Sequence, residues 1–584
     1  MTTFKRVFWA SCLVTMIAAL AGLWLAYGAA LAQQDLSNAR NHASQLNGVG
    51  QDPNRLVKVM KNLKSDLSSA SSRVHDPVWW FASHLPYVGR TPMALITTVD
   101  SLNNVLNAAG RSETDLTNFK RDKGILVDPK LLKIASKIIA DVQPHILAGQ
   151  ASLSALNLAG VPSVLADPVE QVEDQFTGAV PYVKQGQDFL DVAPFLLGLS
   201  EPKTWLLIMN NGAEARATGG MPGGWGTLEA SGGRMKLTRI ETNTAINSRP
   251  LQNWQSYVPA DVAGLYGSDL ARLSDMNLSP DYPTNASLMN ALYRQHTGRE
   301  VDGVLSVDQF TVAGILAATG PVVAAGKKLD ASTVADYLTK GVYKDYRNPA
   351  AKDQAVMEIT RVVFNRLTRG NVNELRIARA LVPSIYRQRV HFWSNDSNIQ
   401  KKIARTSLSG SMQGPEAPSH MVVLINGAGN KIDAYVGAKV SYTAGECLAE
   451  APFRQAMLSV DIKNMAPKFG LPDYVTPRND LEVGLTRKNP GSTKMLVYFH
   501  VPTGSEYVSA QIEGRQVELV AQGTDHGRTV YEIDVVLPAN SKRSLIVKYK
   551  EPALLQDERV SLGIQPMAIP METQINLGTT CVNS

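Results

Sequence analysis

The hydrophobic pattern begins with one long apolar run, Val7 to Ala32, which contains no charged residue and directly follows Lys5 and Arg6. At about 1.5 Å of rise per helical residue, this run exceeds the ~30 Å hydrocarbon core of a bilayer. The sequence therefore predicts a single transmembrane anchor over residues 7–32. Because the basic pair precedes the run, we expect residues 1–6 in the cytoplasm and the bulk of the protein outside it.

A cleaved signal peptide is the alternative interpretation of the same run. Ala30-Leu31-Ala32 has the small-x-small pattern of a cleavage site. The run is longer than the roughly 7–15 residues of a typical signal-peptide core, which favours a retained anchor. Both interpretations place the chain from Gln33 onward outside the cytosol, and the retained anchor would keep it at the cell membrane.

Apolar residues recur at helical spacing over residues 33–200, with interruptions at glycine and proline, and predict a helical stalk or bundle. Within this region, Pro77-Val78-Trp79-Trp80-Phe81 forms an apolar corner between two helices. Such corners most often pack between helices, which is the role we expect. An aromatic cluster of this kind can also enter a membrane interface, and that alternative stays open.

The pattern changes at Lys203 to that of an α/β domain. Trp205 to Met209 is a short apolar run of the buried-strand type, and Gly232-Gly233 between two alternating segments predicts a β-hairpin. Val304 to Val307 predicts a strand that leads directly into a helix. This alternation of strands and helices predicts an α/β central domain over residues 201–405.

The last third of the chain has the pattern of an all-β domain. Residues 406–420 are rich in serine, glycine and proline and are expected to form a linker. From Met421 onward, short alternating strands separated by glycine and proline turns replace the helical spacing. They predict a β-sandwich-like domain over residues 421–584.

Composition and charge narrow the class of protein. The 584-residue chain is 44% hydrophobic, which is enough for several packed domains. Its net charge is +6, from 58 basic and 52 acidic residues, and it has no block of five or more Lys and Arg. This charge distribution argues against a nucleic-acid partner.

The three cysteines indicate one disulfide. Cys12 lies inside the apolar run, which leaves Cys447 and Cys581 in the exported part of the chain. Disulfides persist in oxidising compartments, so we predict that these two residues pair. Two independent buried thiols are the alternative, because a sequence does not give the Cα separation that a bridge requires.

The most distinctive stretch of polar sequence runs from Asn210 to Gly226 and is rich in glycine. Glycines such as Gly219 and Gly220 allow positive φ and a close backbone approach, so a loop of this kind can present N–H groups to an anion. Arg216 would add a positive charge to such a site. The structural alternative is a tight connection in which Arg216 pairs with a nearby carboxylate.

A second polar cluster contains Asp275 and Asp281. With Arg216, Arg249 and Arg272, these carboxylates could organise a hydrated Mg²⁺ and a diphosphate. Asp281 could equally cap the helix expected to start near Thr284. The sequence has no HExxH zinc motif, no Gly-x-Ser-x-Gly elbow and no dinucleotide fingerprint after a strand, so no other cofactor is predicted.

Three ordered motifs resemble a bacterial family known only as a domain of unknown function, the one numbered four thousand and twelve. They are Thr204 to Trp225, Leu273 to Pro283 and Asp302 to Val322, and the resemblance covers about Leu199 to Arg369. Members of that family are typically single-pass envelope proteins. The resemblance therefore implies a location in the cell envelope more than it implies an activity.

A fainter similarity links Leu206 to Arg216 and Asp302 to Val322 with the LytR-CpsA-Psr envelope transferases. These enzymes move glycopolymers from a lipid pyrophosphate carrier to the cell wall, and Arg216 matches an arginine near their first strand. The motif that carries their phosphate-binding arginine and aspartate has no clear copy in this sequence.

From these patterns we expect a membrane-anchored, extracytoplasmic envelope protein that serves binding or assembly, with an envelope glycopolymer or envelope protein as its partner. The alternative is a glycopolymer phosphotransferase that uses Arg216 with Asp275 or Asp281 on a lipid pyrophosphate, with Mg²⁺. A sensor or adhesin is a third possibility.

Overall fold

The fold is that of a computed structural model of the chain. It describes residues 16, 24–35, 37–39, 41–42, 53–86, 89–119, 125–369, 374–415, 417–448, 453–482, 490–552 and 560–577. The chain divides into two compact units, and each is described by itself. The first comprises residues 1–123 with 127–193, and the second comprises residues 124–126 with 194–584.

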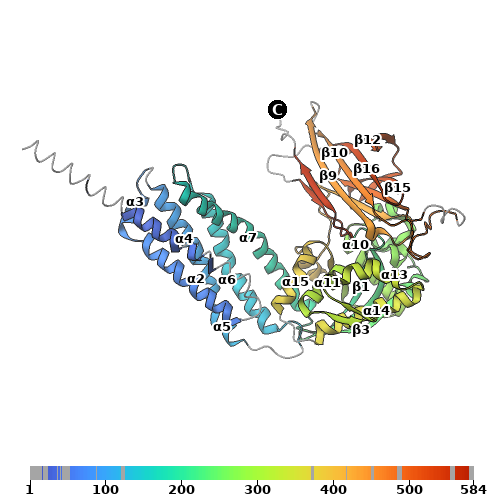
Figure 1. The fold of residues 1–584 in the computed structure, drawn as a ribbon, viewed down its shortest axis with the longest axis horizontal. Helices are drawn as coiled ribbons and strands as arrows, with labels where there is room; N and C mark the ends of the chain where they lie inside the picture. Colours follow the sequence, from blue (N-terminus) through green and yellow to red (C-terminus); the bar gives the residue numbers. More distant parts are fainter. Residues whose placement is uncertain are drawn as a thin grey trace, which may run out of the picture. The chain divides into compact units, whose positions relative to one another are not determined.

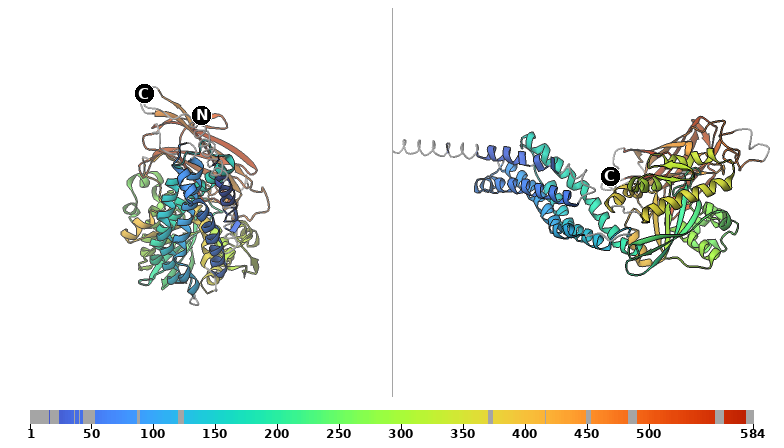
Figure 2. Two further views of the ribbon diagram at one scale, coloured as in Figure 1. Left: turned by 90° about the vertical axis from the view of Figure 1, so that its left-hand side faces the viewer. Right: turned by 60° about the horizontal axis from the view of Figure 1, so that its bottom comes forward.

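The first unit is helical, as the spacing of its apolar residues predicts, and its helices run side by side (Figures 1 and 2). Asp76 caps α3, because its carboxylate accepts from the amides of Val78 and Trp79. Trp79 is buried in the core of this unit. The helices are α2 (Pro53–Val74), α3 (Pro77–Ser83), α4 (Arg90–Gly110), α5 (Glu113–Asn118), α6 (Pro129–Ser154) and α7 (Ser163–Leu196).

The end of the predicted anchor packs against this helical core. Residues 24–35 are helical, and Ala29 and Ala32 are buried in the same cluster as Trp79. Trp24 Nε1 donates to Asp76 Oδ2 over 2.6 Å. Residues 7–15 and 17–23 lie outside the described part of the chain, and within the described part no helix is both long and apolar enough to cross a membrane.

The second unit begins with a five-stranded mixed sheet of order β3-β2-β1-β4-β7. Its central strands, β1 (Lys203–Asn211) and β4 (Gly303–Val307), are parallel, and the outer pairs are antiparallel. The predicted hairpin at Gly232-Gly233 is confirmed, since both glycines adopt positive φ between two paired strands. The outer strands are β2 (Met221–Ser231), β3 (Arg234–Thr242) and β7 (Val390–Ser394).

Alternate residues of β1 face two different layers, as period-two patterning requires. Leu206 and Ile208 pack in one cluster with α10 (Tyr282–Thr297), and Trp205 stacks edge-on against Phe392 of β7. The helix α14 (Pro349–Arg369) lies against β3. The remaining elements of this α/β part are α8 (Thr244–Asn247), α9 (Ala260–Tyr266), α11 (Gln309–Thr319), α12 (Val334–Asp336), α13 (Val342–Asp345), α15 (Glu374–Tyr386), α16 (Ser397–Ile403), β5 (Val322–Ala324) and β6 (Lys327–Leu329).

The C-terminal part of the second unit is a sandwich of two sheets, as the alternating pattern predicts. One sheet has the order β13-β12-β16-β10-β9-β18 and the other has the order β14-β15-β11-β8-β17. Their facing side chains form one apolar core. The strands are β8 (Ser419–Asn426), β9 (Val436–Cys447), β10 (Phe453–Asn464), β11 (Thr493–Val501), β12 (Glu506–Ile512), β13 (Arg515–Val517), β14 (Ala521–Asp525), β15 (Arg528–Leu537), β16 (Ser541–Pro552), β17 (Ser561–Gly563) and β18 (Glu572–Asn576).

The α/β part and the sandwich share a hydrophobic cluster and lie against each other (Figure 2). Val423 and Ile425 of β8 join the cluster that contains Leu270 and Tyr282. The predicted linker, residues 406–420, is packed into this arrangement, with Leu408 and Ser409 buried. Cys447 ends β9, and Cys581 lies outside the described residues, so their disulfide stays a prediction.

Candidate functional site

Arg216, the central residue of the predicted anion site, lies in a buried ion-pair network. Its side chain is 6% exposed, and its NH2 group donates to Glu214 Oε1 over 2.9 Å and to Asp275 Oδ1 over 2.7 Å. Its NH1 group donates to the carbonyls of Ala215 and Asn426. Burial opposes the charge, but the two carboxylates outweigh it and raise the pKa of Arg216. The structure thus shows the arrangement expected of the structural alternative.

The loop around Arg216 joins the α/β part to the sandwich. The amide of Ala215 donates to Asp433 Oδ2 over 2.7 Å, and the amide of Asp433 donates back to the carbonyl of Ala213 over 3.0 Å. Asn426 N donates to the carbonyl of Ala215 over 3.0 Å. Gln565 Nε2 donates to the carbonyl of Arg216 over 2.9 Å. We call this set of contacts the interdomain joint.

Several backbone donors of the loop are used within the protein. The amide of Gly212 donates to the side chain of Gln309, and that of Ala217 donates to the carbonyl of Asn277. At Gly220 a Cβ would lie 2.3 Å from the carbonyl oxygen of Asn211, and both Gly219 and Gly220 have positive φ. The two glycines are therefore required by the tight turn itself.

The other candidate residues do not converge on Arg216. Arg249 and Arg272 are exposed, and Asp275 contacts Arg216 alone among the candidates. Asp281 caps α10, because its carboxylate accepts from the amide of Thr284, so that alternative is confirmed. Among the described residues, no group of three or more His, Cys, Asp and Glu is arranged to hold a metal ion.

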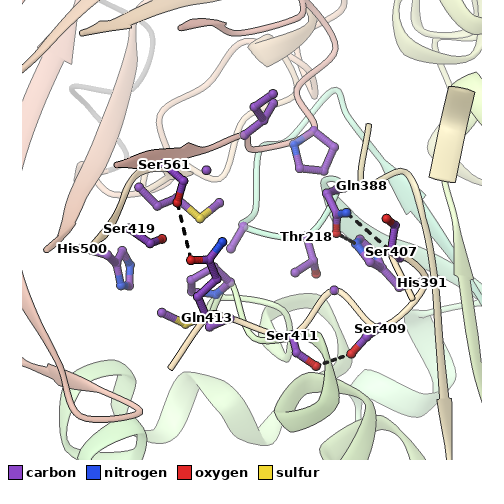
Figure 3. Close-up of a pocket in the computed structure, with 18 of the residues that line it drawn as sticks. Thr218, Gln388, His391, Ser407, Ser409, Ser411, Gln413, Ser419, His500 and Ser561 are labelled. Carbon is purple, nitrogen blue, oxygen red and sulfur yellow. Dashed lines mark hydrogen bonds between the residues drawn. The ribbon is translucent and has the colours of Figure 1, made fainter. Parts of the chain in front are cut away.

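A cavity of about 310 Å³ lies between the α/β part and the sandwich (Figure 3). Hydroxyl, amide and imidazole groups from segments far apart in sequence line it, and we call it the serine cavity. Its labelled lining residues are Thr218, Gln388, His391, Ser407, Ser409, Ser411, Gln413, Ser419, His500 and Ser561.

The polar lining of the serine cavity is neutral apart from one guanidinium. Its two imidazoles are buried, and burial lowers the pKa of His391 to about 3 and that of His500 to about 4. The described lining residues include one charged side chain, Arg528, and no Asp or Glu. The guanidinium of Arg528 donates to the carbonyls of Gly414, Ala417 and Ser419. The cavity therefore carries one positive charge, whose NH1 and NH2 groups already donate to backbone carbonyls, and its other polar groups are neutral.

Gly410 shapes the floor of the serine cavity. It adopts a φ of +57°, and a Cβ there would lie 2.4 Å from His391 Cδ2 and 2.9 Å from Tyr282 Cβ. The ring of His391 stacks on Tyr282 at 4.8 Å, and Gly410 O accepts from the amide of Tyr282. A glycine at this position lets residues 406–413 pass directly over the imidazole.

A second cavity, of about 330 Å³, lies where β1 and β4 end, and we call it the edge cavity. Ligands of α/β proteins commonly bind beyond the carboxyl ends of parallel strands. Its charged groups are paired within the protein, because Lys431 contacts Glu214, Lys352 contacts Asp353 and Asp308 contacts Arg389.

With this geometry in place, the comparison with known families identifies the central segment. Residues 200–343 match the family described as "Protein of unknown function (DUF4012)". The chain carries a DUF4012 domain. This confirms the family resemblance that the three ordered motifs predict. The matched segment holds β1 to β4, the Arg216 loop and the candidate carboxylates Asp275 and Asp281.

Comparisons with other proteins add little to the DUF4012 assignment. No curated protein matches the chain. A solved structure described as a "putative nutrient binding protein" from Legionella pneumophila is similar at 10% identity and a TM-score of 0.15. The match covers 24% of this chain and 43% of that one.

Sequence reasoning found the Arg216 loop but missed the serine cavity. Its lining comes from residues 217–218 and 388–413, from the strands β8, β11, β15 and β17, and from Pro280, Ile564 and Pro566. The serines of residues 406–420 were the only local signal, and their composition is equally typical of an exposed linker.

Proposed function

We propose that this protein is a membrane-anchored, extracytoplasmic envelope protein that binds an uncharged, hydroxyl-rich ligand in the serine cavity. The anchor is supported by the apolar run after Lys5 and Arg6 and by the family resemblance. The observation that carries the binding role is the lining of the cavity, in which hydroxyls, amides and neutral imidazoles make up most of the polar groups beside apolar side chains such as Met412 and Leu562.

The chemistry of the lining favours the glycan part of an envelope glycopolymer. Hydroxyls and carboxamides both donate and accept, so they can match sugar hydroxyls and acetamido groups one by one. A volume of about 310 Å³ lies at the lower end of small-molecule sites and suits one or two sugar rings. Ligand sites also occur preferentially between domains, which is where this cavity lies.

The glycopolymer phosphotransferase remains a second candidate because of the position of the edge cavity at the carboxyl ends of β1 and β4. The phosphate groups of its substrate would need cations that are free to bind them. Arg216 and Lys431 share Glu214, which leaves them partly neutralised, so we favour the uncharged ligand.

The test is calorimetry on the full-length chain in detergent, with N,N′-diacetylchitobiose as the neutral probe and magnesium pyrophosphate as the anionic one. Ser411 is an exposed lining residue, so Ser411→Trp should fill the cavity without disturbing the core. Ser397→Trp is the matched control, because Ser397 is exposed at the start of α16 and outside the lining of both cavities.

We expect chitobiose to bind the wild type and Ser397→Trp and to lose measurable affinity for Ser411→Trp. Binding of pyrophosphate without binding of chitobiose would support the transferase instead. Binding of chitobiose that Ser411→Trp leaves unchanged would place the sugar elsewhere and overturn the assignment of the cavity.

A further inference from the structure

The helix α3 exposes an aromatic face that the proposed binding function does not use. Trp80 and Phe81 are each 63% exposed, whereas their neighbours Trp79 and Ala82 are buried in the helical core. Leu85, just after the helix, is 39% exposed. Contiguous exposed aromatic residues are uncommon on a surface that meets only water.

The point where the apolar leader enters the described structure lies beside this face. Trp24 Nε1 donates to Asp76 Oδ2, and the other oxygen of the same carboxylate caps α3. Trp24 and Tyr27 are themselves 54% and 63% exposed. The exposed aromatic residues of the leader and those of α3 thus lie on either side of the same residue, Asp76, which contacts both segments.

The packing of the leader fixes this arrangement. A Cβ on Gly28 would lie 2.8 Å from Trp79 Nε1, so the leader helix passes in direct contact with the buried tryptophan of α3. Figure 1 shows α3 at one end of the helical unit, with α2 and α4 leading away from it. Among the described residues, Trp24 and Gly28 of the apolar run thus contact α3 and its capping residue.

We propose that Trp80 and Phe81, with Trp24 and Tyr27, form a membrane-interface platform that rests in the headgroup region of the bilayer. Tryptophan and tyrosine prefer this region, because an apolar ring and a polar group can be accommodated there together. The platform rests on the proposed anchor, since residues 7–23 must be inserted for α3 to reach the lipid. It would hold the helical unit against the membrane at a second point and limit its swivelling about the leader.

The test uses the full-length chain reconstituted in phosphatidylcholine vesicles that contain a phospholipid with a photoreactive headgroup. After illumination, peptide mapping measures labelling of the leader, of residues 77–86 and of residues 111–119, which include the distal helix α5. We expect labelling of the leader and of residues 77–86 to exceed that of residues 111–119 several-fold.

The double variant Trp80→Ser, Phe81→Ser removes two exposed rings and leaves Trp79 in the core. It should lower labelling of residues 77–86 several-fold while labelling of the leader stays unchanged. Tyr182→Ser is the matched control, because Tyr182 is 65% exposed on α7. This control should label as the wild type does.

The outcomes separate the platform from the anchor. A labelled leader with unlabelled residues 77–86 would overturn the platform and leave the anchor standing, and would indicate that a protein partner or water covers α3. An unlabelled leader would overturn the anchor and, with it, the membrane location in the proposed function.

Discussion

The sharpest prediction concerns Arg216, which the structure places in the interdomain joint rather than in an open site. Arg216→Met keeps most of the side-chain volume and removes the charge. Breaking one partner of a buried ion pair costs about 3–5 kcal/mol. We expect a cost near the lower end of this range for two reasons. Lys431 stays beside Glu214, and the side chain of Asp275 is 25% exposed to solvent.

A loss of about 3 kcal/mol corresponds to roughly a hundredfold rise in the population of the opened joint, since about 1.4 kcal/mol is a factor of ten. The amide of Ala215 reports that opening directly, because it donates to Asp433 across the joint. Hydrogen exchange followed by mass spectrometry should show the peptide that contains Ala215 exchanging about a hundredfold faster in Arg216→Met than in the wild type.

Arg272→Met is the matched control, because Arg272 is exposed and its loss should change stability by no more than about 0.5 kcal/mol. If Arg216→Met exchanges at the wild-type rate, the ion pairs contribute no stability to the joint. An anion-binding role for the guanidinium would then regain its support.

Three further predictions follow from single features of the second unit. Cys447 and Cys581 should appear as one disulfide-linked peptide under non-reducing conditions, because β9 and β18 run parallel and their paired residues end shortly before the two cysteines. Gly410→Ala should destabilise the protein by more than about 1 kcal/mol in urea unfolding, because of its positive φ and the contact with His391. The free energy of unfolding should fall as the pH drops from about 6.5 toward 4, because burial holds the pKa of His391 and His500 at about 3 and about 4.

The sign of the pH effect follows from the two states. Between pH 4 and 6.5 the unfolded chain binds protons on these histidines and the folded chain does not, so acid favours unfolding by up to about 1.4 kcal/mol per pH unit for each group. His500→Leu should flatten this slope.

Gly414→Ala is the control for Gly410→Ala, since a Cβ on Gly414 meets nothing within 4 Å. Equal stabilities of Gly410→Ala and Gly414→Ala would contradict the prediction for Gly410. A pH dependence that His500→Leu leaves unchanged would contradict the histidine argument. A Cys447 peptide that is not linked to Cys581 would contradict the disulfide.

The local patterns of the sequence were sufficient for most elements of the fold. The apolar run Trp205–Met209 lies within β1, and Gly232-Gly233 turns the β2–β3 hairpin as expected. Period-two alternation after residue 421 likewise gives the sandwich strands. These features depend on neighbours in sequence, which a pattern can express.

The site could not be derived in the same way, because its partners are distant in sequence. In the sequence, Arg216 looks like a ligand-binding residue. In the structure, Asn426 and Asp433 of the sandwich accept hydrogen bonds from Arg216 and from the neighbouring amide of Ala215. The sequence offered both roles for Arg216 and for Asp281, and only the three-dimensional neighbours decide between them. The order of the five-stranded sheet and both cavities are consequences of packing that no local spacing encodes.

The contact between Gln565 and the Arg216 loop also constrains how the chain can fold as it is made. Gln565 bridges the carbonyl of Arg216 to both backbone groups of Leu424, and it lies 349 residues after Arg216. Contacts between residues so far apart in sequence form late, and they lower the folding rate. Until residue 565 has been synthesised, the interdomain joint lacks the hydrogen bonds of Gln565. If the protein is exported as an extended chain, we expect it to need chaperones until those bonds form.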